Sequence, residues 1–565
     1  MPQPDAAAVP RSVPSRLRTG VTTGWASILR LALLAAERPA RVLAALVGIQ
    51  WLALLAFALT VRHNGLVFYQ GGDQIGLTTT ASLLAHGQLP PTVLGFGWPF
   101  LLAPFGWLAP VDYVGFLPFV IGLNVLVLGP LALACVYALA SRIGGRLLGL
   151  WAAALWVAAP YLAILLFRDD YHERYVEQFL PQALGLTALA DYPSMVCLLL
   201  AAFLTLRALD TAEPSLAALA GLAAGFGVAI KPSNVLFLAG PALLVLCSRQ
   251  ARVLLPYGIG LAPPLLLLAL WKVRGLGTLP VFAFEETRLA GGATVGALDV
   301  NRYLDLDWAN LRQNMANLRE FFWSVRVLQW LPLAGAFAVA RRSVPAAGLL
   351  AGWFAAFLLI KGTPAQSTVE SGSFFRLLMP AYPAYFLLAA SIPLLLPGVV
   401  RRIPARLLPG EPRRLGRRAL AAVAVAFVAL PLVAVAAPRP LSRERPDSIT
   451  VGPILTPVDS GIDVRVEARG ARRTLTWTHR DFGSTEVFYR VFRTAAGGQD
   501  FDCLAEGSAD CRLQMLSLGT TREPSYTDLS PPEDALYRIG IATNWRNDSE
   551  GGDVIALSPP IPASG

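Results

Sequence analysis

The residues that could do chemistry are a few charged side chains lying between long apolar stretches. Charges next to membrane-spanning segments are costly, so each one needs a structural or functional reason. The acidic candidates are Asp73, Asp169, Asp170, Glu173, Glu285 and Glu286, and the basic ones are Lys231 and Arg376.

Each candidate also has a simpler structural interpretation. Asp73 follows two glycines, as the residue of a turn or a helix N-cap often does. The acids of the 168–175 run could form a solvated segment that Arg168 and Arg174 neutralise, or, with His172, they could bind a divalent metal through oxygen ligands. Lys231 and Arg376 could be long cationic side chains that extend toward the membrane surface from helix ends.

The composition places these residues in a membrane protein. Of 565 residues, 55% are hydrophobic and 15% are charged, and the mean hydropathy is +0.53. Soluble proteins carry about 25% charged residues. The apolar residues recur in stretches of about 20, the length that spans a bilayer. These values exclude a soluble enzyme, a disordered chain, a coiled coil and a small disulfide scaffold, and they predict a polytopic α-helical membrane protein.

The arginines predict its orientation. Residues 1–41 form a basic tail without the pattern of a removable signal peptide, and later arginines gather in alternate loops, which the positive-inside rule places in the cytoplasm. We therefore expect about 11 transmembrane helices within residues 42–437, with the N-terminus inside and the C-terminus outside. The external loops are 62–115, 168–191, 273–325 and 361–373. The expected spans are Val42–Val61, Phe116–Ala140, Leu147–Phe167, Tyr192–Ala208, Leu216–Ile230, Val235–Cys247, Val253–Trp271, Val327–Ala340, Ala346–Ile360, Phe374–Leu396 and Ala419–Ala437, and Leu94–Pro110 is expected to be re-entrant or interfacial.

Residues 438–565 have a different character. Short alternating runs bounded by turn residues predict an all-β sandwich. The expected strands are Val464–Ala468, Thr474–His479, Val487–Arg493, Arg512–Leu516, Leu536–Thr543 and Val554–Leu557. Cys503 and Cys511 in this segment could pair in an oxidising compartment; the alternative, a metal site, lacks partner cysteines.

The order of these strands resembles a fibronectin type III domain. The resemblance rests on Leu475-x-Trp477, Tyr489-x-Val491-x-Arg493, Tyr526-Thr527-Asp528 and Tyr537-x-Ile539-x-Ile541. It implies that Tyr537 is the tyrosine corner. The predicted topology places the domain outside the membrane.

The membrane part resembles the GT-C glycosyltransferases, multi-pass enzymes that use sugars linked to a polyprenyl-phosphate carrier. The resemblance rests on an acidic residue after the first span (Asp73), a proline-containing stretch (98–104), an Asp-x-Pro step (Asp191-Tyr192-Pro193), a Gly-rich helix ending at Lys231-Pro232, and a late Phe375-Arg376 before Pro380 and Pro383. The usual Asp-Glu pair of the superfamily is Asp73-Gln74 here.

That resemblance implies a function. A sugar would pass from a polyprenyl-phosphate donor to a hydroxyl of a cell-envelope glycan, glycolipid or protein outside the cell membrane. Asp73 would be the general base, and Arg376, then Lys231, would bind the carrier phosphate. Acceptor or substrate contacts are expected from Asp169, Asp170, Glu173, Glu285 and Glu286. A divalent metal (Mg or Mn), used by some members, would lie at Asp73, Asp170 and His172.

Two other functions remain open from the sequence. A transporter or flippase of a lipid-linked substrate would be expected to show internal repeats and charges at mid-membrane, and no repeat is evident. A scaffold whose sandwich binds a partner would not need so many helices. Nucleic-acid binding is not expected, because there is no basic face with interleaved aromatic residues on a soluble domain.

Overall fold

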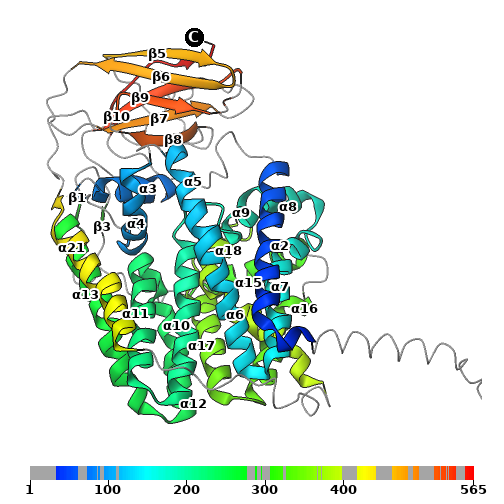
Figure 1. Cartoon of the computed structure of the whole chain (residues 1–565). Coiled ribbons are helices and arrows are strands. Elements are labelled where there is room, and N and C mark those ends of the chain that lie inside the picture. Colours follow the sequence, from blue (N-terminus) through cyan, green and yellow to red (C-terminus); the bar gives the residue numbers. More distant parts are fainter. Residues whose placement is uncertain are drawn as a thin grey trace, which may run out of the picture.

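The protein folds into a helical bundle with a β-sandwich at one end (Figure 1). The computed structural model describes residues 34–61, 73–85, 87–89, 94–109, 113–276, 287–288, 294–295, 306–321, 326–365, 367–370, 372–396, 416–440, 461–480, 488–494, 515–521, 523–529, 531, 533–542 and 554–564. The predicted disulfide residues Cys503 and Cys511, and the acids Glu285 and Glu286, lie outside these residues.

The helices of the bundle follow the apolar runs of the sequence. Their bounds are α2 Pro39–Thr60, α3 Asp73–Ala85, α4 Gly97–Leu102, α5 Tyr113–Leu123, α6 Gly129–Gly144, α7 Arg146–Ile164, α8 Asp169–Arg174, α9 Leu180–Ala183, α10 Asp191–Thr211, α11 Pro214–Ile230, α12 Ala239–Ser248, α13 Leu254–Leu276, α15 Trp308–Phe321, α16 Arg326–Ala340, α17 Val344–Lys361, α18 Ser373–Leu378, α19 Tyr382–Ala390, α20 Arg417–Ala424 and α21 Leu430–Ala436. Short 3-10 or π segments join several of them, such as Asn124–Leu128 between α5 and α6.

Eight helical stretches in the described residues are long and apolar enough to cross a membrane. Three shorter apolar helices, Pro214–Ile230, Pro232–Ser248 and Leu328–Ala340, accompany them. Each predicted span coincides with one of these eleven segments, so the multi-pass membrane character is confirmed. The number that crosses the bilayer, and the orientation, stay predictions. The segment expected to be re-entrant or interfacial contains the short α4 and a 3-10 turn, Ala103–Trp107.

Two glycines allow α11 and α13 to pack closely. A Cβ on Gly221 of α11 would lie 1.9 Å from the carbonyl oxygen of Tyr257, and one on Gly260 of α13 would lie 1.8 Å from that of Ala218. Because no side chain fits there, the two helix backbones approach each other directly. This contact fixes α11, the helix that ends immediately before Lys231.

The C-terminal part is a sandwich of two antiparallel sheets. One sheet has the order β5-β6-β9, and the other has the order β11-β10-β7-β8, with β12 also paired to β10. The buried core includes Leu475, Trp477, Val491, Tyr537 and Ile539. The strand bounds are β5 Ile462–Arg469, β6 Arg472–His479, β7 Phe488–Thr494, β8 Met515–Thr521, β9 Ser525–Asp528, β10 Leu536–Ala542, β11 Val554–Leu557 and β12 Ile561–Pro562.

Most predicted strands are confirmed, with three differences in the sandwich. The strand expected at Arg512–Leu516 continues to Thr521, because it pairs with β7 as far as Thr521 opposite Tyr489. The Gly519-Thr520-Thr521 end looks like a turn in the sequence, and only the neighbouring strand makes it part of a sheet. The short strands β9, Ser525–Asp528, and β12, Ile561–Pro562, were not predicted.

The role predicted for Tyr537 is wrong in its detail. A tyrosine corner donates its hydroxyl hydrogen bond to the backbone, whereas the Tyr537 hydroxyl donates to the Asp528 carboxylate at 2.9 Å. That carboxylate also accepts from Nη1 of Arg493 at 2.6 Å, and the side chains of Asp528 and Arg493 are both fully buried. Burial and the nearby Asp528 charge raise the pKa of the Tyr537 hydroxyl, which therefore remains protonated.

The sandwich is attached to the bundle beside α3. Strand β8 packs against α3 and α5, as Figure 1 shows. Residues Gln88 and Leu89 (β1), just after α3, pair in parallel with Arg439 and Pro440 (β4), which follow the last helix. The guanidinium of Arg274 donates to the carbonyl oxygens of Val435 and Pro438 and so holds that last helix against α13.

We predict that Asp528→Asn will destabilise the sandwich by about 3–5 kcal/mol, because it leaves the buried Arg493 without its countercharge. Hydrogen exchange of the β7 and β10 amides in the full chain should accelerate by at least about 100-fold. Asp463→Asn on the exposed face of β5 is the control. Equal exchange rates in the two variants would contradict the structural role of the Arg493–Asp528 pair.

Candidate functional site

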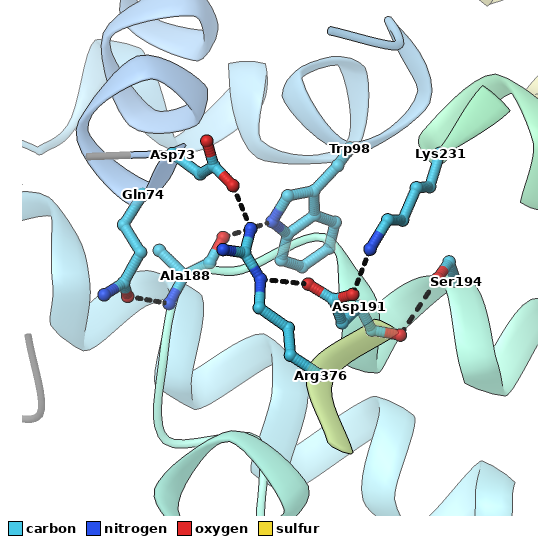
Figure 2. A network of polar contacts seen from close by, with 8 residues as sticks. All are labelled: Asp73, Gln74, Trp98, Ala188, Asp191, Ser194, Lys231 and Arg376. Carbon is cyan, nitrogen blue, oxygen red and sulfur yellow. Dashed lines mark hydrogen bonds and ion pairs between the residues drawn. The ribbon is translucent and has the colours of Figure 1, made fainter. Parts of the chain in front are cut away.

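Four charged side chains meet at the end of the bundle that carries the sandwich. They come from elements far apart in the sequence. Asp73 is the first residue of α3, Asp191 is the first of α10, Lys231 directly follows α11, and Arg376 lies in α18. Figure 2 shows them side by side. We call these four residues the charge cluster.

The charges alternate along the cluster. Nη2 of Arg376 donates to Oδ2 of Asp73, and Nε of the same guanidinium donates to Oδ2 of Asp191 at 3.3 Å. The other oxygen of Asp191 accepts from Nζ of Lys231. The order is therefore Asp73, Arg376, Asp191, Lys231, with Arg376 and Asp191 each contacting two partners (Figure 2).

Burial differs strongly within the cluster. The Asp191 side chain is 2% exposed, while Lys231, Arg376 and Asp73 are 21%, 31% and 36% exposed. A buried carboxylate needs countercharges to offset its loss of hydration, and Asp191 has two of them. Asp73 is the most accessible member of the cluster.

Local structure favours both carboxylates. Asp73 and Asp191 each occupy the first turn of a helix, where the helix dipole stabilises negative charge. Lys231 lies where α11 stops, because Pro232 follows it and cannot continue the helical hydrogen bonds. Asn234 secures this turn by donating from Nδ2 to the carbonyl oxygen of Gly227 at 2.8 Å.

A second set of hydrogen bonds fixes the start of α3. Gln74, whose side chain is fully buried, accepts from the backbone N–H of Ala188 at 2.6 Å. The carbonyl oxygen of Ala188 in turn accepts from the indole N–H of Trp98 in α4 at 2.9 Å (Figure 2). The segment just before Asp191 is thus held between α3 and α4. Gln74 makes this positioning contact.

The segment before Trp98 is anchored to the neighbouring helices. Trp271 and Lys272 of α13 both donate to the carbonyl oxygen of Leu94, at 3.1 and 2.7 Å. A Cβ on Gly97 would lie 2.8 Å from the backbone nitrogen of Ile230 at the end of α11. The elements carrying Asp73 and Lys231 are therefore locked together through α4.

The loop that leads to Arg376 is held by asparagines of α15. Asn310 donates to the carbonyl oxygens of Thr363 and Pro364, at 2.9 and 2.6 Å. Asn314 donates to that of Ser367 at 2.6 Å and accepts from the N–H of Val369 at 3.0 Å. Helix α15, part of the predicted external loop 273–325, therefore contacts the predicted external loop 361–373. A cavity of about 420 Å³ lies between Arg312 of α15 and Gln329 of α16. No residue of the charge cluster lines this cavity.

The acids of α8 lie in a different environment. Asp169 and Glu173 are exposed, and His172 is half-buried. Tyr171 donates to the carbonyl oxygen of Val369 at 2.6 Å, and burial raises the pKa of its hydroxyl. Arg174 donates to the carbonyl oxygen of Glu370. Within the residues that the structure describes, no hydrogen bond or ion pair connects these acids to the charge cluster.

The predicted metal set of Asp73, Asp170 and His172 stays a prediction, because the side chain of Asp170 lies outside the described residues. Those residues contain no group of three or more His, Cys, Asp or Glu side chains that could hold a metal ion. Asp73 contacts the guanidinium of Arg376 in this structure, and a carboxylate paired in this way is poorly placed to serve as a metal ligand.

The structure brings together Asp73, Arg376 and Lys231, and it adds Asp191, to which the sequence assigned no chemical role. One signal for Asp191 was present: a carboxylate at the start of a long apolar helix is costly unless a cation accompanies it. Only the folded chain identifies those cations, because they lie 40 and 185 residues further along the sequence.

Comparisons with known proteins show a distant structural similarity. No family model and no curated protein matches the sequence. The structure is similar to the crystal structure of the Archaeoglobus fulgidus oligosaccharyltransferase in the apo form, with a TM-score of 0.37 and 14% sequence identity. The match covers 71% of this chain and 56% of that one, so the chain spans little more than half of that protein. So distant a similarity does not support an assignment of function. Any such assignment must rest on the charge cluster.

We predict that Gly372→Ala will disrupt the start of α18 and displace Arg376. Gly372 has a φ of +74°, and a Cβ there would lie 1.3 Å from the Phe179 ring. Strain and overpacking should lower the free energy of unfolding by about 2–4 kcal/mol. Thermal unfolding of the purified full chain in detergent would measure the loss. Gly258→Ala in α13, where a Cβ meets nothing within 4 Å, is the matched control; an equal melting temperature in both variants would contradict the prediction.

Proposed function

We propose that the protein is a GT-C-type glycosyltransferase that uses a polyprenyl-phosphate-linked sugar. The observation that carries the proposal is the contact of Asp73 with Arg376. It places an accessible carboxylate beside one cation at one end of an apolar bundle, and Asp191 joins that cation to a second one, Lys231. A base for the acceptor hydroxyl and cations for a leaving phosphate are the two groups that such a transfer requires.

In the proposed reaction, Asp73 takes the proton of the acceptor hydroxyl. The acceptor oxygen forms a bond to the anomeric carbon of the sugar, and the bond from that carbon to the phosphate oxygen breaks. The carrier phosphate leaves with an additional negative charge. Arg376 and Lys231, which Asp191 holds together, stabilise that charge electrostatically.

The rest of the chain has proposed roles consistent with this reaction. The end of the bundle that carries the cluster and the sandwich would face the exterior of the cell membrane, where the acceptor is a glycan, glycolipid or protein. Asp169, Asp170, Glu173, Glu285 and Glu286 would contact acceptor or donor, and a Mg or Mn ion would bind near Asp170 and His172. The sandwich would be a fibronectin type III-like domain, which its division into β5-β6-β9 and β11-β10-β7-β8 supports.

We predict that Asp73→Asn will lower the rate of sugar transfer by about 10²–10⁴-fold, the usual contribution of a general base. The assay would present radiolabelled polyprenyl-phosphate pentoses and hexoses to the full chain in liposomes and follow glycoside formation. Asp463→Asn on β5 should remain as active as the unchanged protein. Full transfer by Asp73→Asn would rule out Asp73 as the base.

The same liposomes separate this function from the alternative, a transporter or flippase. A transporter would move the labelled lipid between the two leaflets and form no glycoside. An enzyme would form a glycoside when the donor is supplied to the leaflet that the cluster faces, and it would not need to move the donor across the membrane. Transbilayer movement of donor without glycoside formation would overturn the proposed function.

A further inference from the structure

The general base proposed above is not free in this structure. Nη2 of Arg376 donates to Oδ2 of Asp73, so a guanidinium engages the carboxylate that must accept a proton. Arg376 is also the first candidate for binding the carrier phosphate. Both the Asp73 carboxylate and the carrier phosphate would therefore bind Arg376. In this structure Arg376 is paired with Asp73.

The burial of the cluster determines which anion can be replaced. The Asp191 side chain is 2% exposed and contacts both cations, whereas the Asp73 side chain is 36% exposed and contacts Arg376. Moving Asp191 would take its carboxylate away from both Lys231 and Arg376 and leave Arg376 with Asp73 alone, whereas moving Asp73 would return an accessible carboxylate to water. An incoming anion therefore displaces Asp73 and leaves Asp191 in place.

We propose that Arg376 is exchanged between Asp73 and the carrier phosphate during the reaction. In the resting protein the guanidinium holds Asp73. When the donor binds, a phosphate oxygen takes the position of the Asp73 carboxylate at Nη2, and Asp73 becomes free to accept the proton of the acceptor hydroxyl. This inference rests on the proposed function and goes beyond it, because it makes the donor phosphate the signal that releases the base.

The charges balance through one cycle. The donor is a phosphodiester with about one negative charge, and the released carrier is a monoester with about two at most. Asp73 gains the proton of the acceptor hydroxyl and becomes neutral, so the total charge does not change. A neutral Asp73 no longer competes for Arg376, which stays on the leaving phosphate. When Asp73 later loses its proton to water, it recovers the guanidinium and promotes release of the carrier.

Asp191 acts in this exchange as a positioning residue. Its carboxylate fixes Nε of Arg376 and Nζ of Lys231, and its own backbone carbonyl accepts from the Ser194 hydroxyl at 2.9 Å. The guanidinium can then change partners at Nη2 without leaving its place. Without the contact to Asp191, the guanidinium would move together with whichever anion it binds, Asp73 or the phosphate.

The test is the affinity of the full chain in nanodiscs for polyprenyl phosphate that carries no sugar. If Asp73 occupies Arg376 for about nine-tenths of the time, the apparent affinity is about tenfold below its intrinsic value. Asp73→Asn should therefore bind polyprenyl phosphate about tenfold more tightly than the unchanged protein, and Asp73→Ala should do the same. Asp463→Asn on the sandwich should bind as the unchanged protein does.

A double-mutant cycle separates exchange from simple repulsion between Asp73 and the phosphate. With exchange, the gain from Asp73→Asn requires Arg376, so it should fall below about twofold when Arg376→Gln is already present. With repulsion alone, the same tenfold gain would persist in the Arg376→Gln background, and the proposal would be overturned. Equal affinity of Asp73→Asn and the unchanged protein would also overturn it.

The outcomes distinguish this inference from the proposed function. If the protein transfers sugar but Asp73→Asn does not raise its affinity for polyprenyl phosphate, the proposed function stands and the exchange is ruled out. If the protein neither binds polyprenyl phosphate nor transfers sugar, both the proposed function and the exchange are ruled out.

Discussion

The arrangement of the site depends on one buried carboxylate, Asp191, held between two cations. A carboxylate that is 2% exposed at the start of an apolar helix would be strongly unfavourable alone. Lys231 and Arg376 offset that cost by pairing with the two oxygens of the same carboxylate, despite their mutual repulsion. The folded cluster therefore has a fixed interior part and an accessible edge, Asp73, where chemistry with a substrate is possible.

The surrounding structure holds these four side chains in position. The glycine contact between α11 and α13 fixes the helix that ends at Lys231. Asparagines of α15 hold the loop that leads to Arg376, and the Gln74–Ala188–Trp98 hydrogen bonds hold the start of α3 against the start of α10. The β1–β4 pairing holds the segment after the last helix beside the end of α3. Strand β8 of the sandwich also contacts α3, the helix that begins with Asp73.

The sequence predicts the elements well because their signals are local. Apolar length identifies the spans, and alternation identifies most strands. It also predicts Asp73, Lys231 and Arg376 as candidates, because charges are rare in this part of the chain. It does not predict which charges pair. The partners of Asp191, the asparagine contacts of α15 and the Tyr537–Asp528 bond all join residues brought together by packing, and no spacing along the chain encodes them. The end of β8 was likewise set by its neighbour in the sheet.

The proposed function requires the charge cluster to bind the carrier phosphate where the chemistry takes place. An experimental structure of the full chain with polyprenyl phosphate bound in a nanodisc would test this requirement. We expect phosphate density against Arg376 and Lys231, with Asp191 still between them and the Asp73 carboxylate separated from Arg376. Phosphate bound elsewhere on the protein, with the Asp73–Arg376 pair intact, would contradict it.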